Sequence, residues 1–379
     1  MKKIGLNVLS LFDGISGGQQ AFFKLFKQIE FEHYYIKNYY SVEIDKYAIA
    51  ITKYNFPKTI FLGSVEKLNY KDIDELENID ILIGGSPCQG FSFAGKRKGA
   101  ITKENIEITT LNQYLRLKEE NFEFSGQSYL FWEYIRILKY LQNKNKNLLF
   151  LLENVVMLPK WKNIFDKTIG CEPILIDSAL LSAQQRKRFY WTNLCNNIKQ
   201  PNNKFISLYD ILEDNIKLKN YNGSSLYIDK YNLNKGAIRG RRIDDNNKRV
   251  DKNLKLPIVQ CLEVTDTINS NILKSNCITT VEKDNILTPL NKGRYIDVFN
   301  KFNSKSTNKY PYRYYTLVEL ERLQTLLKDN YTKYGIFNIK GKNIIKEISK
   351  SQRIKSIGNG WTVDVIVYLL HQLLSISRK

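Results

Sequence analysis

The first half of the chain alternates between short apolar runs and segments with helical spacing. Apolar runs that predict strands lie at residues 4–12, 39–44, 79–83, 148–152 and 173–176. Helices are predicted between them at 19–29, 46–54 and 128–141, and in the first and last of these apolar residues recur every three or four positions. The 148–152 run is apolar throughout, which is typical of a strand buried on both faces of a parallel sheet. The alternation predicts a doubly wound α/β fold with a mostly parallel sheet.

This alternation stops after about residue 195. From there to about residue 310, Asn and Lys dominate, apolar runs are short, and basic loops with glycines appear, one of them at 235–242. An apolar amphipathic helix predicted at 361–374 marks the return of the earlier character. We therefore expect a main domain over residues 1–195, a second domain over 196–345, and a C-terminal segment over 346–379 that returns to the main domain.

The charge of the chain favours a polyanionic partner. The 379 residues include 58 Lys and Arg against 38 Asp and Glu, which gives a formal net charge of +20 at pH 7. Such an excess is typical of proteins that bind nucleic acid, although richness in Lys and Asn also reflects an AT-rich genome. No segment is apolar enough to span a membrane, and the start lacks the apolar core and cleavage site of a signal peptide. We expect a cytoplasmic protein.

The cysteines and histidines limit the nucleophilic chemistry that is open to the chain. None of the five cysteines forms a CxxC pair, and their spacing matches no zinc framework: Cys88, Cys171, Cys195, Cys261 and Cys277. An odd, scattered set fits a reducing cytosol rather than a disulfide scaffold. Only two histidines occur, His33 in a Tyr-rich stretch and His371 in the apolar terminal helix. We therefore expect carboxylates, rather than a His-activated pair, to carry the acid–base work.

One cysteine lies where a ligand would bind. Residues 81–92 read Ile-Leu-Ile-Gly-Gly-Ser-Pro-Cys-Gln-Gly-Phe-Ser, so Cys88 stands at the carboxyl end of an apolar strand. Ligands of open α/β sheets bind at that end, and a thiol there is a candidate nucleophile. Residues 151–155, Leu-Leu-Glu-Asn-Val, place Glu153 and Asn154 after another strand, at the same edge if the strands are parallel. A solvated loop acid is the commoner fate of one Glu, but the pairing with Cys88 favours a site.

A turn with several glycines joins the first predicted strand to the first predicted helix. It reads Phe-Asp-Gly-Ile-Ser-Gly-Gly over residues 12–18, where glycines let the backbone approach a ligand closely. Glu43 follows about 30 residues later, at the end of the second strand, where an acid can bond both hydroxyls of a ribose. The pattern fits NAD, FAD or S-adenosylmethionine, and the absence of GxGxxG disfavours a dinucleotide. A turn without a ligand is the alternative.

Two further motifs carry cations and glycines. Residues 184–190 read Gln-Gln-Arg-Lys-Arg-Phe-Tyr, and Arg186 and Arg188 would point to one face of a strand, where they suit phosphate or carboxylate contacts. A solvated basic edge strand is the alternative. Residues 357–361 read Ile-Gly-Asn-Gly-Trp, and Trp361 would either cover an adenine or pack in the core.

Taken together, these motifs resemble those of the DNA cytosine-5 methyltransferases, and they occur in the order of that family. The series comprises the 12–18 turn, Pro87-Cys88-Gln89, Glu153-Asn154-Val155, Gln184-x-Arg186-x-Arg188, residues 313–324 and Gly358-Asn359-Gly360-Trp361. The resemblance covers both ends of the chain and leaves only about 196–310 without family motifs. It is closest to the eukaryotic de novo branch and to phage and bacterial relatives that share its variants.

The chain departs from the family pattern in four places. Ser16 replaces the second glycine of Phe-x-Gly-x-Gly, and Ser64 stands where family members often carry an acid for the adenine amino group. Leu317-Val318 replaces Thr-Pro, and Thr325-Leu326 replaces Gly-Phe. The first two departures fall in the implied cofactor site, and none of the four touches an implied catalytic residue.

The resemblance implies a Rossmann-like, S-adenosylmethionine-dependent catalytic domain over 1–195 and a smaller, irregular, β-rich target-recognition domain over 196–345. Cys88 would attack carbon 6 of a flipped cytosine in double-stranded DNA, Glu153 would act at ring nitrogen 3, and Asn154 would orient that acid. Carbon 5 would then take the methyl group, which leaves S-adenosylhomocysteine, and no metal is required. Arginines near Cys88 would stabilise its thiolate.

The same resemblance assigns expected roles to individual residues. The expected catalytic residues are Cys88, Glu153, Asn154, Arg186, Arg188 and Pro87. The expected cofactor residues are Phe12, Asp13, Gly14, Ile15, Glu43, Ile44, Ser64, Val65, Leu130, Asn359 and Trp361. The expected DNA contacts are Gln89, Ser92, Arg239, Arg241 and Arg242.

The resemblance also sets the expected context. The family implies a monomer on short, specific duplex sites, in a restriction–modification system with a separate endonuclease or in self-protection of a phage genome. A tRNA-cytosine methyltransferase is the second enzyme hypothesis, although the Cys-Phe-Thr motif of that branch is absent. A catalytically silent DNA-binding relative and, last, an NAD oxidoreductase complete the alternatives.

Overall fold

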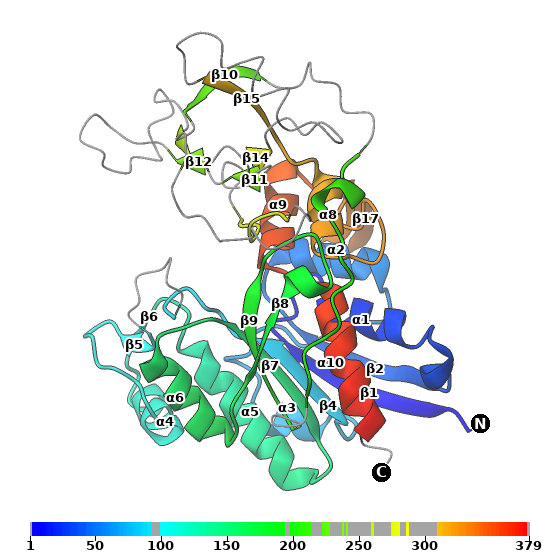
Figure 1. Cartoon of the computed structure of the whole chain (residues 1–379). Helices are drawn as coiled ribbons and strands as arrows, with labels where there is room; N and C mark the ends of the chain where they lie inside the picture. The colour runs from blue at the N-terminus through cyan, green and yellow to red at the C-terminus, as the bar shows by residue number, and fades with distance from the viewer. Residues whose placement is uncertain are drawn as a thin grey trace.

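The computed structural model describes residues 2–91, 99–193, 198–213, 222–227, 237–238, 240–241, 259–260, 274–280, 286–287 and 309–376. Its centre is a seven-stranded sheet in the order β3-β2-β1-β4-β7-β9-β8 (Figure 1). The strands are β1 (Ile4–Leu11), β2 (Tyr34–Val42), β3 (Ile60–Phe61), β4 (Ile81–Gly85), β7 (Leu149–Val155), β8 (Ile174–Asp177) and β9 (Lys187–Thr192). Only β9 runs antiparallel to its neighbours. The predicted doubly wound, mostly parallel sheet is confirmed.

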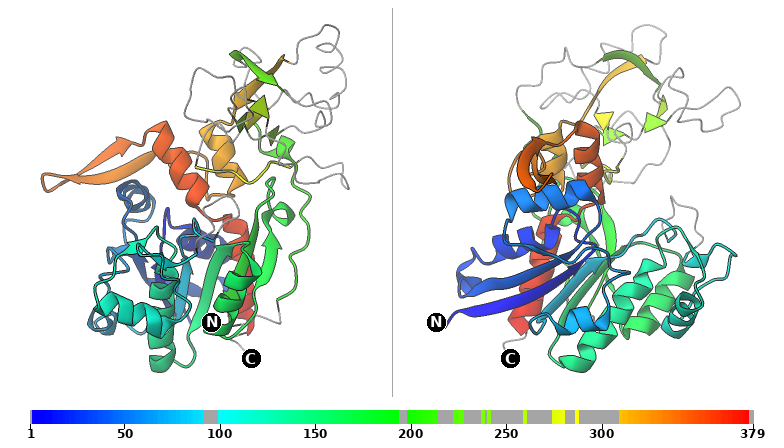
Figure 2. Two further views of the ribbon diagram at one scale, coloured as in Figure 1. Left: turned by 90° about the vertical axis from the view of Figure 1, so that its left-hand side faces the viewer. Right: turned by 180° about the vertical axis from the view of Figure 1, so that it is seen from behind.

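Helices cover both faces of this sheet, which is visible from behind in Figure 2. One face is covered by α1 (Gly17–Leu25) and α10 (Val363–Ile376), and the other by α5 (Leu130–Lys144) and α6 (Pro159–Ile169). Successive strand residues serve opposite faces, because Cβ atoms alternate along a strand. Val8 and Leu151 belong to the apolar cluster with α1 and α10, whereas their neighbours Leu9 and Leu152 belong to the cluster with α5 and α6. Both faces of these strands are therefore buried, as the apolar run at 148–152 predicted.

Shorter elements connect the layers and extend the first unit. They are α2 (Lys46–Asn55), α3 (Tyr70–Asp74), β5 (Ile101–Thr102), α4 (Leu111–Glu119), β6 (Phe124–Ser125), α8 (Leu317–Leu323), β16 (Tyr334–Ile339), β17 (Lys342–Glu347) and α9 (Lys350–Asn359), with single 3-10 turns at Ile29–Phe31, Ser178–Leu180 and Leu208–Asp210. The β16–β17 hairpin packs on α2 through β16, and Figure 2 shows it projecting from the molecule.

A second, six-stranded sheet lies apart from the first, in the upper part of Figure 1. Its short strands follow the order β11-β14-β15-β10-β13-β12. They are β10 (Asn222–Tyr227), β11 (Ala237–Ile238), β12 (Gly240–Arg241), β13 (Val259–Gln260), β14 (Ile286–Leu287) and β15 (Lys309–Tyr314). The described residues of the second unit thus have the β-rich character that we expected.

The contacts favour an earlier end for this second unit than residue 345. Leu320, Leu323, Tyr331 and Ile348 are buried in the same cluster as α1 and α10. We propose that the second unit ends near residue 314 and that the chain from there on belongs to the first.

The chain also returns briefly to the first unit at residues 274–278. The Ser275 N–H donates to the Ala183 carbonyl at 2.7 Å, and the Gln185 N–H donates to the Ser275 carbonyl at 2.8 Å. The Lys274 ammonium donates to the carbonyls of Ala179 and Ser182 at 2.8 and 2.9 Å. Main-chain hydrogen bonds and the carbonyl contacts of the Lys274 ammonium therefore fix this segment to the loop that precedes β9.

Several local predictions need correction. The first helix spans Gly17–Leu25 rather than 19–29, because the chain turns at residues 26–28 and a separate 3-10 turn follows at Ile29–Phe31. Glu153 and Asn154 lie within β7 rather than after it, and β9 is an internal strand, so its arginines do not form a solvated edge. Cys171 is disulfide-bonded, contrary to the expectation from the scattered cysteines, because spacing alone does not reveal which thiols the fold brings together.

No helix among the described residues has the length and apolar character needed to cross a bilayer.

Candidate active site

Two neighbouring parallel strands bring Cys88 and Glu153 to the same edge of the sheet. Gly85, the last residue of β4, pairs with Glu153 of β7, and Cys88 follows three residues later. The side chain of Cys88 is half-buried, and Glu153 is 12% exposed. Pro87 lies between the strand end and the cysteine, so the thiol stands at the carboxyl edge of the sheet, as predicted from the sequence.

The Glu153 carboxylate has a protein partner on each oxygen. Its Oε1 lies 2.9 Å from Nε of Arg188, on the antiparallel neighbour β9. Its Oε2 accepts a hydrogen bond of 3.1 Å from the indole Nε1 of Trp361. The pairing of β7 with β9 gives the salt bridge its place in the fold, whereas the Trp361 contact joins residues that are 208 positions apart.

The surroundings of Cys88 favour its neutral thiol. Burial raises the pKa of Cys88, and the negative charge of Glu153 raises it further, whereas Arg188 and Arg186 oppose the rise. Both arginines lower the pKa of Cys88 and so favour its thiolate, as expected, but burial and Glu153 outweigh them and the net shift is upward. Burial is the largest cause of the rise, and Arg188 is also paired with the carboxylate of Glu153.

Arg186 does not bind Glu153; it holds the main chain just before Trp361. Its guanidinium donates to the Gly360 carbonyl at 3.0 Å and lies 3.4 Å from the Gly358 carbonyl. It also lies 3.4 Å from Sγ of Cys277, and Arg188 reaches the same sulfur at 3.9 Å. The two arginines therefore lie on one side of the sheet, as their spacing predicted, but they have different partners.

Asn154 orients the cysteine loop and not the acid. Its Nδ2 donates to the Ser86 carbonyl at 3.2 Å and to the Ser86 hydroxyl at 3.0 Å. Its Oδ1 accepts from the N–H of Val155. The prediction that Asn154 orients Glu153 is wrong, because adjacent strand residues point to opposite faces of a sheet. The amide is buried and ties β7 to the residue two positions before Cys88.

The turn after β1 is built around Asp13. Its carboxylate accepts hydrogen bonds from four hydroxyls, those of Ser10 at 2.6 Å, Ser16 at 2.5 Å, Tyr39 at 2.7 Å and Ser41 at 2.8 Å. Burial raises the pKa of Asp13, and these donors oppose the rise. The four donors fill the acceptor sites of the carboxylate, so Asp13 holds the turn together.

Ser16 explains why a glycine is usual at its position. It is the residue before α1 and has left-handed backbone angles, φ 56° and ψ 47°. An L-residue pays about 1–2 kcal/mol for this conformation, whereas glycine does not. The buried hydroxyl of Ser16 offsets that cost through its bond to Asp13.

Glu43 closes the same turn from the end of β2. Its Oε2 accepts from the N–H of Gly14 at 2.8 Å, and its Oε1 accepts from the N–H groups of Ile44 and Asp45 at 2.7 and 2.8 Å. Burial raises the pKa of Glu43, and these three N–H groups oppose the rise. A carboxylate offers about four acceptor sites, so one remains for a ligand hydroxyl.

The other expected cofactor residues surround this turn and the strand ends beside it. Phe12 has φ 58°, Ile15 is buried, and Ile44 is 67% exposed. Ser64 and Val65 follow β3, Leu130 begins α5, and Asn359 is the exposed last residue of α9.

The turn leaves room for a ligand. A Cβ placed on Gly14 or on Gly63 would meet no atom within 4 Å, and both glycines have positive φ. The remaining acceptor site on the Glu43 carboxylate and the open space beside Gly14 fit a nucleoside cofactor such as S-adenosylmethionine. Among the described residues, no group of three or more His, Cys, Asp or Glu side chains is placed to hold a metal ion.

The expected DNA contacts fall largely outside what the structure describes. Gln89 is exposed beside the cysteine. Ser92, Arg239 and Arg242 lie outside the described residues, and for Arg241 only the backbone, in β12, is described.

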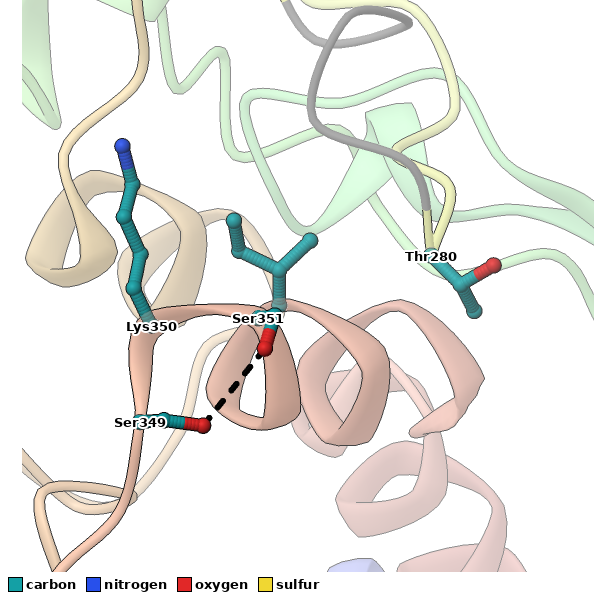
Figure 3. Close-up of a pocket in the computed structure, with 5 residues that line it drawn as sticks. Thr280, Ser349, Lys350 and Ser351 are labelled. Atoms are coloured by element: carbon teal, nitrogen blue, oxygen red, sulfur yellow. Dashed lines mark hydrogen bonds between the residues drawn. The ribbon is translucent and has the colours of Figure 1, made fainter. Parts of the chain in front are cut away.

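One cavity is lined by neither Cys88 nor Glu153. It has a volume of about 410 Å³ and is lined by Thr280, Ser349, Lys350, Ser351 and Ile354, at the N-terminus of α9 (Figure 3). None of these residues was predicted as a site residue.

Sequence reasoning missed two features of the site. It placed Trp361 at the cofactor but not on Glu153, and it gave no role to Cys277, which lies against both arginines. The Trp361 contact spans most of the chain, so no local pattern signals it. No motif in the sequence signals the place of Cys277 beside the arginines.

Comparison with known proteins agrees with this geometry. The family model described as C-5 cytosine-specific DNA methylase matches residues 6–375. The chain therefore belongs to the C-5 cytosine-specific DNA methylase family.

Individual relatives match shorter stretches. The orphan methyltransferase M.SPRI of Bacillus phage SPR is 36% identical over 122 residues, which make up 31% of this chain and 25% of that protein. The type II methyltransferase M.NlaIV of Neisseria lactamica is 31% identical over 150 residues, or 40% of this chain and 28% of that protein. The chain thus aligns with only about a quarter of the length of these curated relatives.

Solved structures share the fold over the whole chain. The Entamoeba histolytica methyltransferase EhMeth superposes with a TM-score of 0.57 and 15% identity, covering 99% of both chains. A mutant of Spodoptera frugiperda DNMT2 gives a TM-score of 0.56 and 20% identity, covering 97% of this chain and 99% of that one. At these identities the likeness concerns the fold.

Proposed function

We propose that this protein transfers a methyl group from S-adenosylmethionine to carbon 5 of a cytosine in double-stranded DNA. The observation that carries the proposal is the placement of Cys88 and the Arg188-paired Glu153 on adjacent parallel strands, at one sheet edge. Membership of the C-5 cytosine-specific DNA methylase family supports the reaction class. Cys88 would be the nucleophile, Glu153 the acid, and the turn at residues 12–18 the cofactor site.

The chemistry of cytosine requires a nucleophile of this kind. Carbon 5 is a poor nucleophile until carbon 6 is attacked, so a covalent bond from Cys88 Sγ to carbon 6 divides one difficult step into two easier ones. The electron pair displaced from the ring makes carbon 5 nucleophilic, and bound S-adenosylmethionine supplies the methyl group. A base, for which we propose water, then removes the carbon-5 proton, and Sγ leaves carbon 6 as the ring double bond re-forms.

Glu153 has two roles in the proposed reaction: it handles a proton at ring nitrogen 3, and its charge affects the pKa of Cys88. A proton shared between its carboxyl group and ring nitrogen 3 withdraws electrons from the ring during attack by sulfur. Glu153 first takes this proton up from solvent, and while it is neutral it no longer raises the pKa of Cys88, whose thiol releases its own proton to solvent before sulfur attacks. The remaining charges of Arg186 and Arg188 then favour the thiolate. We therefore propose that activation of Cys88 depends on the binding of the base.

Access to carbon 6 requires the cytosine to leave the base stack. Flipping costs roughly a few kcal/mol, and contacts between basic side chains and phosphates offset that cost. The net charge of +20 supports such contacts. We propose that the second unit reads a short duplex site and that the protein serves in restriction–modification or in phage self-protection, as the names of its relatives suggest.

Radiolabelled S-adenosylmethionine and a random-sequence duplex library test this proposal directly. We expect incorporation of label into duplex DNA, its loss in Cys88→Ser, and its retention in Cys261→Ser, a cysteine outside the quoted motifs. Duplexes with 5-fluorocytosine should trap a covalent complex at Cys88, because fluorine cannot leave carbon 5 as the proton does. Label in tRNA but not in duplex DNA would favour the second enzyme hypothesis, and label in neither would refute methyl transfer to cytosine.

A further inference from the structure

The Glu153 carboxylate is held by two donors of different kinds. Arg188 contributes a guanidinium to Oε1, and Trp361 contributes a neutral indole N–H to Oε2. A carboxylate held at one oxygen can still rotate about its last torsion, whose energy wells are broad. A donor at each oxygen fixes the plane of the group as well as its position.

The indole has room beside Glu153 because Gly85 carries no side chain. A Cβ on Gly85 would stand 2.8 Å from both Trp361 Nε1 and Glu153 Oε2, closer than real contacts allow. A Cβ on Gly17 would stand 3.6 Å from the other side of the Trp361 side chain. The ring therefore lies between the start of α1 and the end of β4, next to both the cofactor turn and the cysteine loop.

The main chain before Trp361 is itself fixed by buried side chains. The Gly360 carbonyl accepts hydrogen bonds of 3.0 Å from both Arg186 and Gln324. Gln324 also donates to the Ile357 carbonyl at 2.9 Å. The position of the indole is thus set by the protein core and not by a loose loop.

We infer that Trp361 is a positioning residue, whose indole N–H orients the Glu153 carboxylate for its reaction with the cytosine ring. This inference rests on the proposed function of Glu153. An indole N–H donates but does not accept, so it directs the acid without competing with it for the proton that ring nitrogen 3 must share. The ring also borders the cofactor turn, so one side chain links the two halves of the site.

The chain contains a matched control for this bond. Trp191 donates its indole N–H to Asp166 at 2.8 Å, and both residues lie on the face of the sheet covered by α6. Trp191→Phe removes the same kind of indole–carboxylate bond away from Cys88. Trp361→Phe keeps an aromatic ring and removes the N–H together with part of the bicyclic indole, and Trp191→Phe makes the same change in ring size.

A spectroscopic experiment tests the bond without any turnover. The sequence has four tryptophans, so the indole signal of Trp361 in a ¹H–¹⁵N spectrum is identified by its loss in Trp361→Phe. We expect that signal to shift upfield and to exchange with solvent faster in Glu153→Ala. An unchanged position and exchange rate would overturn the inference, whether or not the protein methylates DNA.

A kinetic double-mutant cycle tests the role. With saturating cofactor and duplex DNA, Trp361→Phe should slow single-turnover methyl transfer on the order of tenfold, the usual effect of one hydrogen bond to a charged group. The dissociation constant of S-adenosylmethionine, measured by calorimetry, should change less than about threefold, since the ring remains. In a Glu153→Gln background, the effect of Trp361→Phe on the rate should disappear.

An equal loss of rate in both backgrounds would mean that the ring acts by packing alone, and it would overturn the inference. A loss in Trp191→Phe as large as that in Trp361→Phe would have the same meaning. If the wild-type protein transfers no methyl group, the proposed function fails, and the spectroscopic experiment alone decides whether Trp361 holds Glu153.

Discussion

Gly85 and Glu153 stand directly opposite each other in the parallel pairing of β4 with β7. The missing side chain of Gly85 is what gives the Glu153 carboxylate its space, because a Cβ there would lie 2.8 Å from Oε2. The residue that ends the strand before the cysteine loop thus also sets the place of the acid.

Gly85→Ala should lower activity more than stability. The added methyl group must displace Glu153 or Trp361, so we expect methyl transfer to fall more than about tenfold, in line with misplaced catalytic groups. Gly84→Ala is the matched comparison, because its Cβ would lie 3.0 Å from the Leu11 carbonyl and from the Tyr134 ring, in the core. It should mainly lower the melting temperature. Rate assays and thermal unfolding of both variants check this, and the reverse order of effects would contradict it.

Alkylation of Cys88 should report the charge of Glu153. Burial and Glu153 raise the pKa of Cys88, and only the thiolate reacts with iodoacetamide. The midpoint of its alkylation rate against pH should therefore lie above that of an ordinary thiol. Glu153→Gln removes one of the raising causes, so the midpoint should move to lower pH. Peptide mass spectrometry isolates the Cys88 signal, and Glu172→Gln, at an exposed acid, serves as the control.

Ser16 variants should separate backbone strain from hydrogen bonding. Ser16→Ala keeps the left-handed strain and loses the bond to Asp13, so we expect a loss of about 2 kcal/mol in the free energy of unfolding. Ser16→Gly loses the same bond but relieves about 1–2 kcal/mol of strain, so it should fall between Ser16→Ala and the wild type. Urea unfolding measures both. A glycine variant more stable than the wild type would show that the strain outweighs the bond.

Binding of S-adenosylmethionine should depend on the ionisation of Glu43. The pKa of this carboxyl is raised by burial. Protonation would turn one of its acceptor oxygens into a donor, so only the ionised form keeps every acceptor site for its N–H partners and for a ribose hydroxyl. Affinity should therefore be full at high pH and fall as the pH drops, starting at a higher pH than for an exposed Glu. Glu43→Gln should bind about tenfold more weakly, with little dependence on pH. Calorimetry over a falling pH series checks this, and a wild-type affinity that stays constant down to the ordinary pKa range of an exposed Glu would contradict it.

The sequence predicted the sheet well because its strands are buried on both faces. Val8 and Leu9 serve opposite clusters, so the run that contains them is apolar throughout and easily recognised. The same rule of alternation would have excluded the role given to Asn154, had Glu153 been placed inside β7. That error came from the strand boundary and not from the chemistry.

Other parts of the site depend on distances that no pattern encodes. Trp361 meets Glu153 across 208 positions, and Arg186 meets Gly360 across 174. The raised pKa of Cys88 depends on how deeply the thiol is buried, which is a property of the packed fold. The sequence placed the arginines near Cys88, but it could not show whether they or Glu153 and burial would dominate the pKa of that thiol.

The fastening of residues 274–278 to the loop before β9 has a consequence for engineering. Ser275 pairs with Ala183 and Gln185, and the Ile278 N–H donates to the Gln184 side chain at 3.1 Å. The segment between residue 213 and Lys274 therefore enters and leaves the first unit through anchored ends. The Glu213 N–H donates to the Glu319 carboxylate at 3.1 Å, which anchors the other end. Under the proposed function, we expect a segment grafted between these anchors to change the DNA target without displacing Cys88 or Glu153.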